Sequence, residues 1–335
     1  MSVPTTVYAR DTTFGTERIN STSRMTYKVA SLCSGYGGLE LGLQLAGVKA
    51  ELSWVAETNK AASKVLDARF NVPNLGDITQ IDNPIGVDIV TAGFPCQPVS
   101  WAGKHEGTKD ERWLINDVVE LATRADAQWI FLENVRGLLA PSKSEAFGQV
   151  IDALSSNGYD ARWSCVRADQ SVGACHRRDR WFCVAYSSGK RHGSRQDIGL
   201  VGELGSKSEA QEWKPGSAWQ ELVDRIKETE NTTDSLCKRL ERQGKEHELQ
   251  ERSREINFTW GDYGSAIERW EQVIGRKAPY PTDGNKVDPC FVEWMMGLPE
   301  GWVTHVDLSY REKMQLLGNG VVPLQAGFAY RKLLI

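Results

Sequence analysis

Cys96 stands between two prolines in the segment GFPCQPVS, residues 93–100, which follows an apolar run that predicts a strand. Proline restricts the backbone, so this loop would hold the cysteine in few conformations. A thiol held in this way can act as a nucleophile where a neighbouring base or a lowered pKa supplies the thiolate. Inert packing is the commoner use of a lone cysteine, but the neighbours Pro95, Gln97 and Pro98 favour a chemical role.

Two further groups of polar residues are placed where they could act on the same substrate. In FLENVRGL, Glu133 and Asn134 end an apolar run, and a carboxyl group in apolar surroundings can keep its proton near neutral pH and act as an acid. In RRDR, residues 177–180, Arg178 and Arg180 alternate, so on a strand both would face one side. They could hold a base carbonyl, a phosphate or a structural carboxylate. Helix capping for the first pair and salt bridging for the second are the alternatives.

The segment SLCSGYGGLELG predicts a strand, a glycine turn and a helix in succession. Gly35, Gly37 and Gly38 allow the backbone to approach a ligand closely. Their spacing is G-x-G-G and not the dinucleotide pattern G-x-G-x-x-G, which disfavours a nicotinamide oxidoreductase. Glu57, at the end of the next predicted strand, suits a ribose diol, and Asp77 in GDIT suits an adenine amino group. A plain turn and solvated acids are the alternatives.

These residues need a sheet whose strand ends bring them together. Between Tyr27 and Tyr186, short apolar runs alternate with amphipathic stretches, a pattern typical of an α/β fold with a mostly parallel, doubly wound sheet. Strands are expected within 26–35, 50–57, 87–95, 127–135, 162–169 and 177–187, and helices within 39–47, 58–70 (capped by Thr58 or Asn59), 113–125 and 144–159. Ligands bind at the carboxyl ends of such strands, where the polar residues fall.

The motifs SGYGG, GFPCQ, ENV and the terminal GNGV together resemble the motif series of the DNA (cytosine-5) methyltransferases. The resemblance covers about Tyr27–Tyr186 and Val287–Leu334. It implies a Rossmann-like, S-adenosylmethionine-dependent methyltransferase domain with a mixed, mostly parallel sheet, formed by residues 26–187 and 303–335. A smaller target-recognition domain, residues 188–302, would interrupt it, and residues 1–25 would form a polar N-terminal arm. We refer to residues 188–302 as the recognition segment.

The resemblance also implies a reaction and a role for each motif residue. A methyl group would pass from S-adenosylmethionine to carbon 5 of a flipped-out cytosine in a specific double-stranded DNA sequence. Cys96 would add to C6, Glu133 would act on N3, and Arg180, supported by Arg178, would hold O2. Gln97 and Ser100 would contact the DNA. The donor would be bound by Ser34, Gly35, Tyr36, Gly37, Gly38, Glu57, Asp77, Ile78, Asn319 and Val321.

Three positions depart from the pattern of the family. Cys33 stands where an aromatic residue usually stacks on the adenine of the donor, Ser31 where an acid is common, and His176 where glutamine is preferred. None of these removes a residue that the reaction requires. The departures bear on donor affinity and not on the type of reaction.

Two other functions remain open: a catalytically silent DNA-binding protein and an RNA cytosine-5 methyltransferase of the same fold. The net charge of −4 does not decide between them. The seven cysteines form no C-x-x-C pair and the five histidines have no ligand spacing, so we expect no metal and a reducing compartment. Without a long apolar run or a signal sequence, we expect no membrane contact and a cytoplasmic monomer in a bacterial or phage-infected cell. A cognate restriction endonuclease is a partner that the sequence leaves open.

Overall fold

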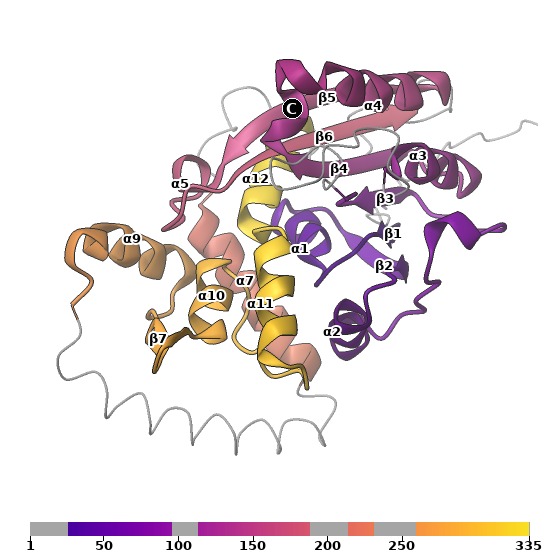
Figure 1. The fold of residues 1–335 in the computed structure, drawn as a ribbon. Helices are drawn as coiled ribbons and strands as arrows, with labels where there is room; N and C mark the ends of the chain where they lie inside the picture. The colour runs from indigo at the N-terminus through magenta and orange to yellow at the C-terminus, as the bar shows by residue number, and fades with distance from the viewer. Residues whose placement is uncertain (1–25, 96–112, 188–213, 231–258, 335) are drawn as a thin grey trace, which may run out of the picture.

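A computed structural model describes residues 26–95, 113–187, 214–230 and 259–334 of the chain (Figure 1). The predicted N-terminal arm, much of the recognition segment, and Cys96, Gln97 and Ser100 lie outside these residues. The described residues form a six-stranded sheet in the order β2-β1-β3-β4-β6-β5 and a two-stranded sheet of β7 and β8. The strands are β1 (Tyr27–Leu32), β2 (Ala50–Ala56), β3 (Ile89–Ala92), β4 (Trp129–Val135), β5 (Tyr159–Arg167), β6 (Asp179–Ser187), β7 (Thr282–Asp283) and β8 (Lys286–Val287).

The large sheet is mixed and mostly parallel. Strands β2, β1, β3 and β4 pair in parallel, and β6 runs antiparallel to both of its neighbours, β4 and β5. This confirms the predicted α/β class. The carboxyl ends of the parallel strands therefore lie at one edge of the sheet, together with the start of β6.

Helices cover both faces of this sheet. The described α-helices are α1 (Gly38–Leu45), α2 (Lys60–Phe70), α3 (Ile115–Arg124), α4 (Ser144–Ser156), α5 (Ala168–Ser171), α7 (Pro215–Glu230), α9 (Gly264–Ile274), α10 (Pro289–Met295), α11 (Tyr310–Asn319) and α12 (Pro323–Leu334). Helices α3 and α4 pack on one face, with Ile130 and Leu132 of β4. Helices α1 and α12 pack on the other face, with Trp129 and Phe131. Because β4 is buried on both faces, its sequence shows a continuous apolar run and not an alternation.

The cap of α2 distinguishes between the two residues expected for it. The side chain of Asn59 accepts hydrogen bonds from the backbone N–H groups of Ala61 and Ala62, so Asn59 is the N-cap and not Thr58.

A third apolar cluster joins the sheet domain to the described part of the recognition segment. Leu41 of α1 and Val65 of α2 share this cluster with Trp219, Trp270 and Trp294, which come from α7, α9 and α10. These three tryptophans of the recognition segment therefore lie in a core that includes the helices after β1 and β2.

The described part of the chain contains no helix long and apolar enough to cross a lipid bilayer.

Candidate active site

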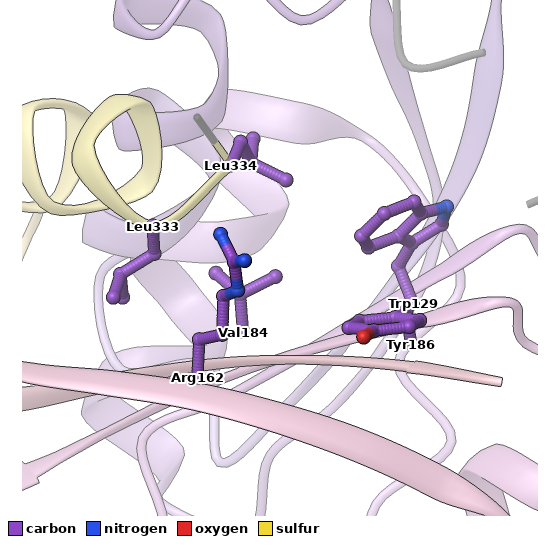
Figure 2. Close-up of a pocket in the computed structure, with 6 residues that line it drawn as sticks. All are labelled: Trp129, Arg162, Val184, Tyr186, Leu333 and Leu334. Carbon is purple, nitrogen blue, oxygen red and sulfur yellow. The ribbon is translucent and has the colours of Figure 1, made fainter. Parts of the chain in front are cut away.

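One small pocket lies away from the predicted chemistry. It is lined by Trp129, Arg162, Val184, Tyr186, Leu333 and Leu334 (Figure 2). Trp129 is the first residue of β4, whereas Glu133 is near the carboxyl end of the same strand. The pocket thus lies at the opposite edge of the sheet from the motif residues, and we do not assign the reaction to it.

The carboxyl ends of β1, β3 and β4 meet at Gly93. A methyl group placed on Gly93 would lie 3.6 Å from Glu133 Oε2 and 3.8 Å from the carbonyl oxygen of Cys33. The predicted acid and the turn after β1 are therefore neighbours, as the parallel sheet requires.

The glycine turn after β1 is bound to the end of β2. Gly35 N donates a hydrogen bond of 2.9 Å to Glu57 Oε2, and Asn59 N donates one of 2.8 Å to Glu57 Oε1. Gly35 and Gly37 have φ angles of +57° and +84°, which favour glycine. Apart from its two neighbours in the chain, no described residue has an atom within 4 Å of the position that a Cβ on Gly35 would take. Within the described part of the chain, this turn therefore leaves open space beside a fixed carboxylate.

Cys33 lies close enough to Asp77 for the charge of Asp77 to act on the Cys33 thiol. Asp77 caps a short 3₁₀ helix, Ile78–Gln80, by accepting hydrogen bonds of 2.9 Å and 2.8 Å from the N–H and the hydroxyl of Thr79. Burial, followed by the charges of Glu57 and Asp77, raises the pKa of the Cys33 thiol to about 12. Cys33 is therefore a neutral thiol near both acids that were predicted to bind the donor, and its small side chain stands there in place of a ring.

Tyr36, in the middle of the glycine turn, has a side chain that packs in the core. Its side chain is 1% exposed, and its hydroxyl donates a 2.7 Å hydrogen bond to the carbonyl of Val321. A Cβ on Gly320 would overlap the Tyr36 ring, so the ring depends on glycine at position 320. The side chain of Tyr36 thus packs in the core, and it brings the C-terminal motif, which includes Asn319 and Val321, against the glycine turn.

Glu133 and Arg180 form an ion pair at the carboxyl end of β4. Arg180 Nε lies 3.1 Å from Glu133 Oε1. Glu133 is opposite Phe182 in the antiparallel register, so Arg180 is its diagonal neighbour on the same face. Burial raises the pKa of Glu133, and the charges of Arg180 and Arg178 oppose that rise. The carboxyl group therefore keeps its proton more readily than an exposed glutamate.

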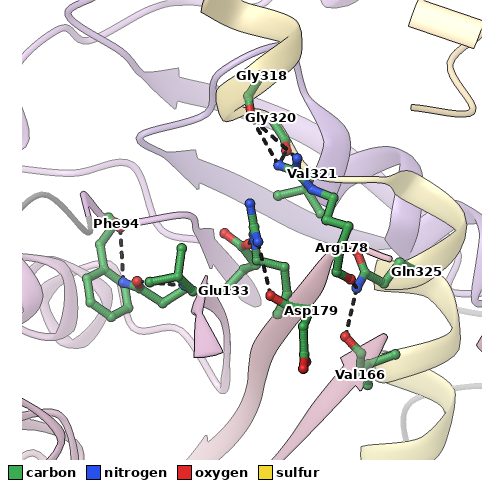
Figure 3. A network of polar contacts seen from close by, with 12 residues as sticks. Phe94, Glu133, Val166, Arg178, Asp179, Gly318, Gly320, Val321 and Gln325 are labelled. Atoms are coloured by element: carbon green, nitrogen blue, oxygen red, sulfur yellow. Dashed lines mark hydrogen bonds and ion pairs between the residues drawn. The ribbon is translucent and has the colours of Figure 1, made fainter. Parts of the chain in front are cut away.

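Arg178 has contacts of a different kind from those of Arg180. It precedes β6 and donates hydrogen bonds to the carbonyls of Gly318, in the last turn of α11, and of Gly320, the C-cap of that helix (Figure 3). Gln325 of α12 donates bonds of 2.8 Å to the backbone carbonyls of Arg178 and Val166. Arg178 thereby connects the start of β6 to the C-terminal motif.

Asn134 is a site residue whose specific role the sequence did not reveal. Its Nδ2 donates a buried hydrogen bond of 3.2 Å to the carbonyl of Phe94, and its Oδ1 accepts one of 2.8 Å from Val135 N. Phe94 is two positions before Cys96 in the sequence. Asn134 thus fixes the last part of the GFPCQ motif that the structure describes. Its position directly after Glu133, at a strand end, was the available signal.

His176, the residue in place of the expected glutamine, lies close to both arginines. Neither ring nitrogen has a hydrogen-bond partner in the described part of the structure, although both are buried. Burial, followed by the charges of Arg178 and Arg180, lowers the pKa of His176 to about 4. The imidazole is therefore neutral at physiological pH and adds no charge to this site.

Within the described residues, no group of three or more His, Cys, Asp or Glu side chains could hold a metal ion.

Comparison with known proteins shows which protein family the sequence matches. A family model for C-5 cytosine-specific DNA methylases matches residues 27–333. The Type II methyltransferase M.BsuFI of Bacillus subtilis is 35% identical over 173 residues, 51% of this chain and 41% of that protein. M.NaeI of Lentzea aerocolonigenes is 35% identical over 163 residues, 47% of this chain and 39% of that protein. The chain thus spans about four tenths of the length of these curated relatives.

A solved structure shares the fold. The Dnmt2 methyltransferase of S. pombe superposes with a TM-score of 0.53 at 18% sequence identity, covering 92% of this chain and 98% of that one. At this identity the likeness concerns the fold alone.

Proposed function

The chain belongs to the family of C-5 cytosine-specific DNA methylases, and from this premise we propose that it transfers a methyl group from S-adenosylmethionine to carbon 5 of cytosine in double-stranded DNA. One observation carries the proposal most directly. The buried carboxyl of Glu133, whose pKa is raised by burial, lies 3.1 Å from Arg180 and beside the glycine turn at the carboxyl ends of the parallel strands. A protonated acid and a cation together suit a ring that has both a basic nitrogen and a carbonyl.

The turn after β1 and the two acids near it would hold the donor. The backbone of Ser34–Gly38 would lie along its methionine part, Glu57 would accept from the ribose hydroxyls, and Asp77 with Ile78 would contact the adenine. The fixed carboxylate of Glu57 and the open space over Gly35 support this assignment. When bound, the donor supplies an electrophilic methyl group. Asn319 and Val321 would close the site from the C-terminal motif.

The side chains of the chain itself would activate the cytosine. The Cys96 thiolate forms a bond to C6 while Glu133 gives a proton to N3, so that electron density moves to C5 and C5 takes the methyl group. Loss of the C5 proton to a base, breaking of the C6–S bond and return of the N3 proton then restore the aromatic ring and the thiolate. Arg180 would hold O2 throughout. We assign Arg178 to supporting Arg180 and the C-terminal motif, in keeping with its bonds to Gly318 and Gly320.

A stacked base cannot reach these groups, so the cytosine must leave the duplex at a cost of a few kcal/mol. Gln97 and Ser100, on the same loop as the proposed nucleophile, would help to hold the opened duplex. The recognition segment would read the sequence through contacts to base edges and phosphates.

A transfer assay tests the proposal. The full chain is incubated with labelled S-adenosylmethionine and long duplex DNA of mixed sequence, and in parallel with RNA. We expect label in the DNA, located by bisulfite sequencing at cytosines of one short motif, and none with the Cys96→Ala variant. Label in RNA alone would favour the RNA methyltransferase. Binding to DNA without transfer to either substrate would favour a silent DNA-binding protein.

The matched relatives are named Type II methyltransferases, and we propose that this chain likewise acts in restriction and modification. DNA from cells that express it should then resist an endonuclease whose site contains the methylated cytosine. Full cleavage of that DNA, with methylation verified at the site, would contradict this role.

A further inference from the structure

The peptide unit between Tyr36 and Gly37 is hydrogen-bonded at both ends. Its N–H, on Gly37, donates a 3.0 Å bond to the carbonyl of Ser34, which closes the glycine turn. Its carbonyl oxygen, on Tyr36, accepts a buried 2.8 Å bond from the indole Nε1 of Trp302, which is 266 positions further along the chain. The orientation of this peptide therefore depends on a residue outside the glycine turn.

Trp302 is itself held by several independent contacts. Arg69 Nε donates a 2.9 Å bond to the Trp302 carbonyl, and its guanidinium carbon lies 5.3 Å from the centre of the Trp302 ring. Phe70 meets the same ring edge-on, with centroids 5.7 Å apart. The indole is 3% exposed. These contacts leave the side chain little freedom, so its N–H has a fixed direction.

A buried carboxylate fixes the loop that carries Trp302. Glu293 accepts hydrogen bonds from the backbone N–H groups of Gly301 (2.8 Å), Val303 (2.6 Å) and Thr304 (2.9 Å), and from the Thr304 hydroxyl (2.8 Å). Four bonds to one carboxylate offset the cost of burying its charge. The loop from 301 to 304 is thus anchored to α10 on one side and to the glycine turn on the other.

We propose that Trp302 is a positioning residue for the methyl-donor turn: its indole N–H sets the orientation of the Tyr36–Gly37 peptide and, with it, the turn on which the donor binds. The donor assignment rests on the proposed function. Without this bond the Tyr36 carbonyl is buried and unpaired, a state that costs free energy. Glycine at 37 tolerates other backbone conformations, so the turn would adopt arrangements that do not fit the donor.

The test compares two tryptophans of the same apolar cluster. Trp302→Phe keeps an aromatic ring and removes the bond to the turn. Trp270→Phe is the matched control, because Trp270 Nε1 donates a buried 3.0 Å bond to the carbonyl of Trp294, away from the turn. Calorimetric titration with S-adenosylhomocysteine should give a dissociation constant raised about tenfold by Trp302→Phe and less than twofold by Trp270→Phe, with similar losses of thermal stability. Equal affinities for the two variants would overturn the proposal.

Two additional measurements keep the inference testable. Arg69→Lys, a milder change that loosens the support of Trp302, should weaken donor binding in the same direction if Trp302→Phe does not fold, and unchanged affinity would count against the proposal. If the wild-type chain binds no donor at all, the proposed function fails, but hydrogen exchange still tests the inference. Amides of residues 34–38 should exchange faster in Trp302→Phe than in Trp270→Phe, and equal rates would overturn it.

Discussion

Glu133 on β4 and Arg180 on β6 are diagonal neighbours whose side chains meet at 3.1 Å, Oε1 to Nε, on strands that run in opposite directions. An antiparallel strand inserted beside a parallel sheet has its amino end at the carboxyl edge of its neighbour. A cation at the start of β6 and an acid near the end of β4 are brought together in this way. The ion pair gives the buried Glu133 carboxyl a charged partner. Burial nevertheless raises the pKa of Glu133 more than the arginine charge lowers it, so the carboxyl retains its proton more readily.

Replacement of Glu133 by glutamine should lower kcat by about 10²–10³-fold, because an amide can donate to N3 but cannot transfer a proton to it. Wild-type turnover should also decline at alkaline pH, since burial raises the pKa of Glu133 and the reaction uses its protonated form. The Glu133→Gln variant should lack this decline. Rates of labelled methyl transfer measured across pH 6–10 check both expectations, and a variant that retains the wild-type rate would remove Glu133 from the mechanism.

Cys96 should form a covalent bond with a trapped substrate. In duplex DNA that contains 5-fluorocytosine, the fluorine at C5 of the base cannot be lost as a proton is. The enzyme should therefore remain attached to the DNA after methyl transfer and migrate as a larger species in a denaturing gel. Cys96→Ala should give no such species and a transfer rate at the detection limit. Cys290→Ala, a change at a half-buried cysteine of α10, serves as the control and should trap normally. An adduct that persists in Cys96→Ala would assign the nucleophile to another residue.

Arg178 should contribute to stability through the carbonyls that it caps. Arg178→Met removes the charged hydrogen bonds to Gly318 and Gly320 at the C-terminal end of α11, and we expect the free energy of unfolding to fall by about 2 kcal/mol. Arg177→Met, at the exposed neighbouring position, should change it by less than about 0.5 kcal/mol. Urea denaturation of both variants measures the difference. Equal effects would mean that the interaction with the C-terminal motif is not energetically important.

The alternating strands and helices could be predicted from local sequence patterns, but the contacts between distant segments could not. The turn containing Gly35 and the strand end at Glu133 follow from short apolar runs that stop at polar residues. The bonds from Trp302 to Tyr36 and from Arg178 to Gly320 span 266 and 142 positions. They depend on how the helices of the third apolar cluster and the C-terminal motif pack against the sheet. No local sequence pattern indicates that packing. Tyr36 illustrates the difference, because the local motif places it in the glycine turn but does not indicate that its hydroxyl bonds to the carbonyl of Val321.

Glu40 is a further buried carboxyl group, and it lies close to the glycine turn. It lies on α1, is 4% exposed, and its Oε1 accepts a hydrogen bond from the Thr91 hydroxyl of β3. Burial raises its pKa, and the Thr91 hydrogen bond opposes that rise. Glu40 does not belong to the proposed chemistry, so its effect on stability can be measured without interference from turnover.

Stability should fall with increasing pH because of Glu40, and Glu40→Gln should weaken that dependence. The folded chain binds the Glu40 proton more tightly than the unfolded chain, whose glutamates titrate near about 4.3, so the penalty is absent below that pH and grows as the pH rises toward the folded pKa. Gln retains an acceptor for Thr91 and cannot ionise. The free energy of unfolding, measured in urea from pH 5 to 8, should therefore decrease less steeply in Glu40→Gln than in the wild type. Glu120→Gln makes the same chemical change at an exposed position of α3 and should keep the wild-type slope. A wild-type slope in Glu40→Gln as well would mean that Glu40 is already ionised in the folded protein.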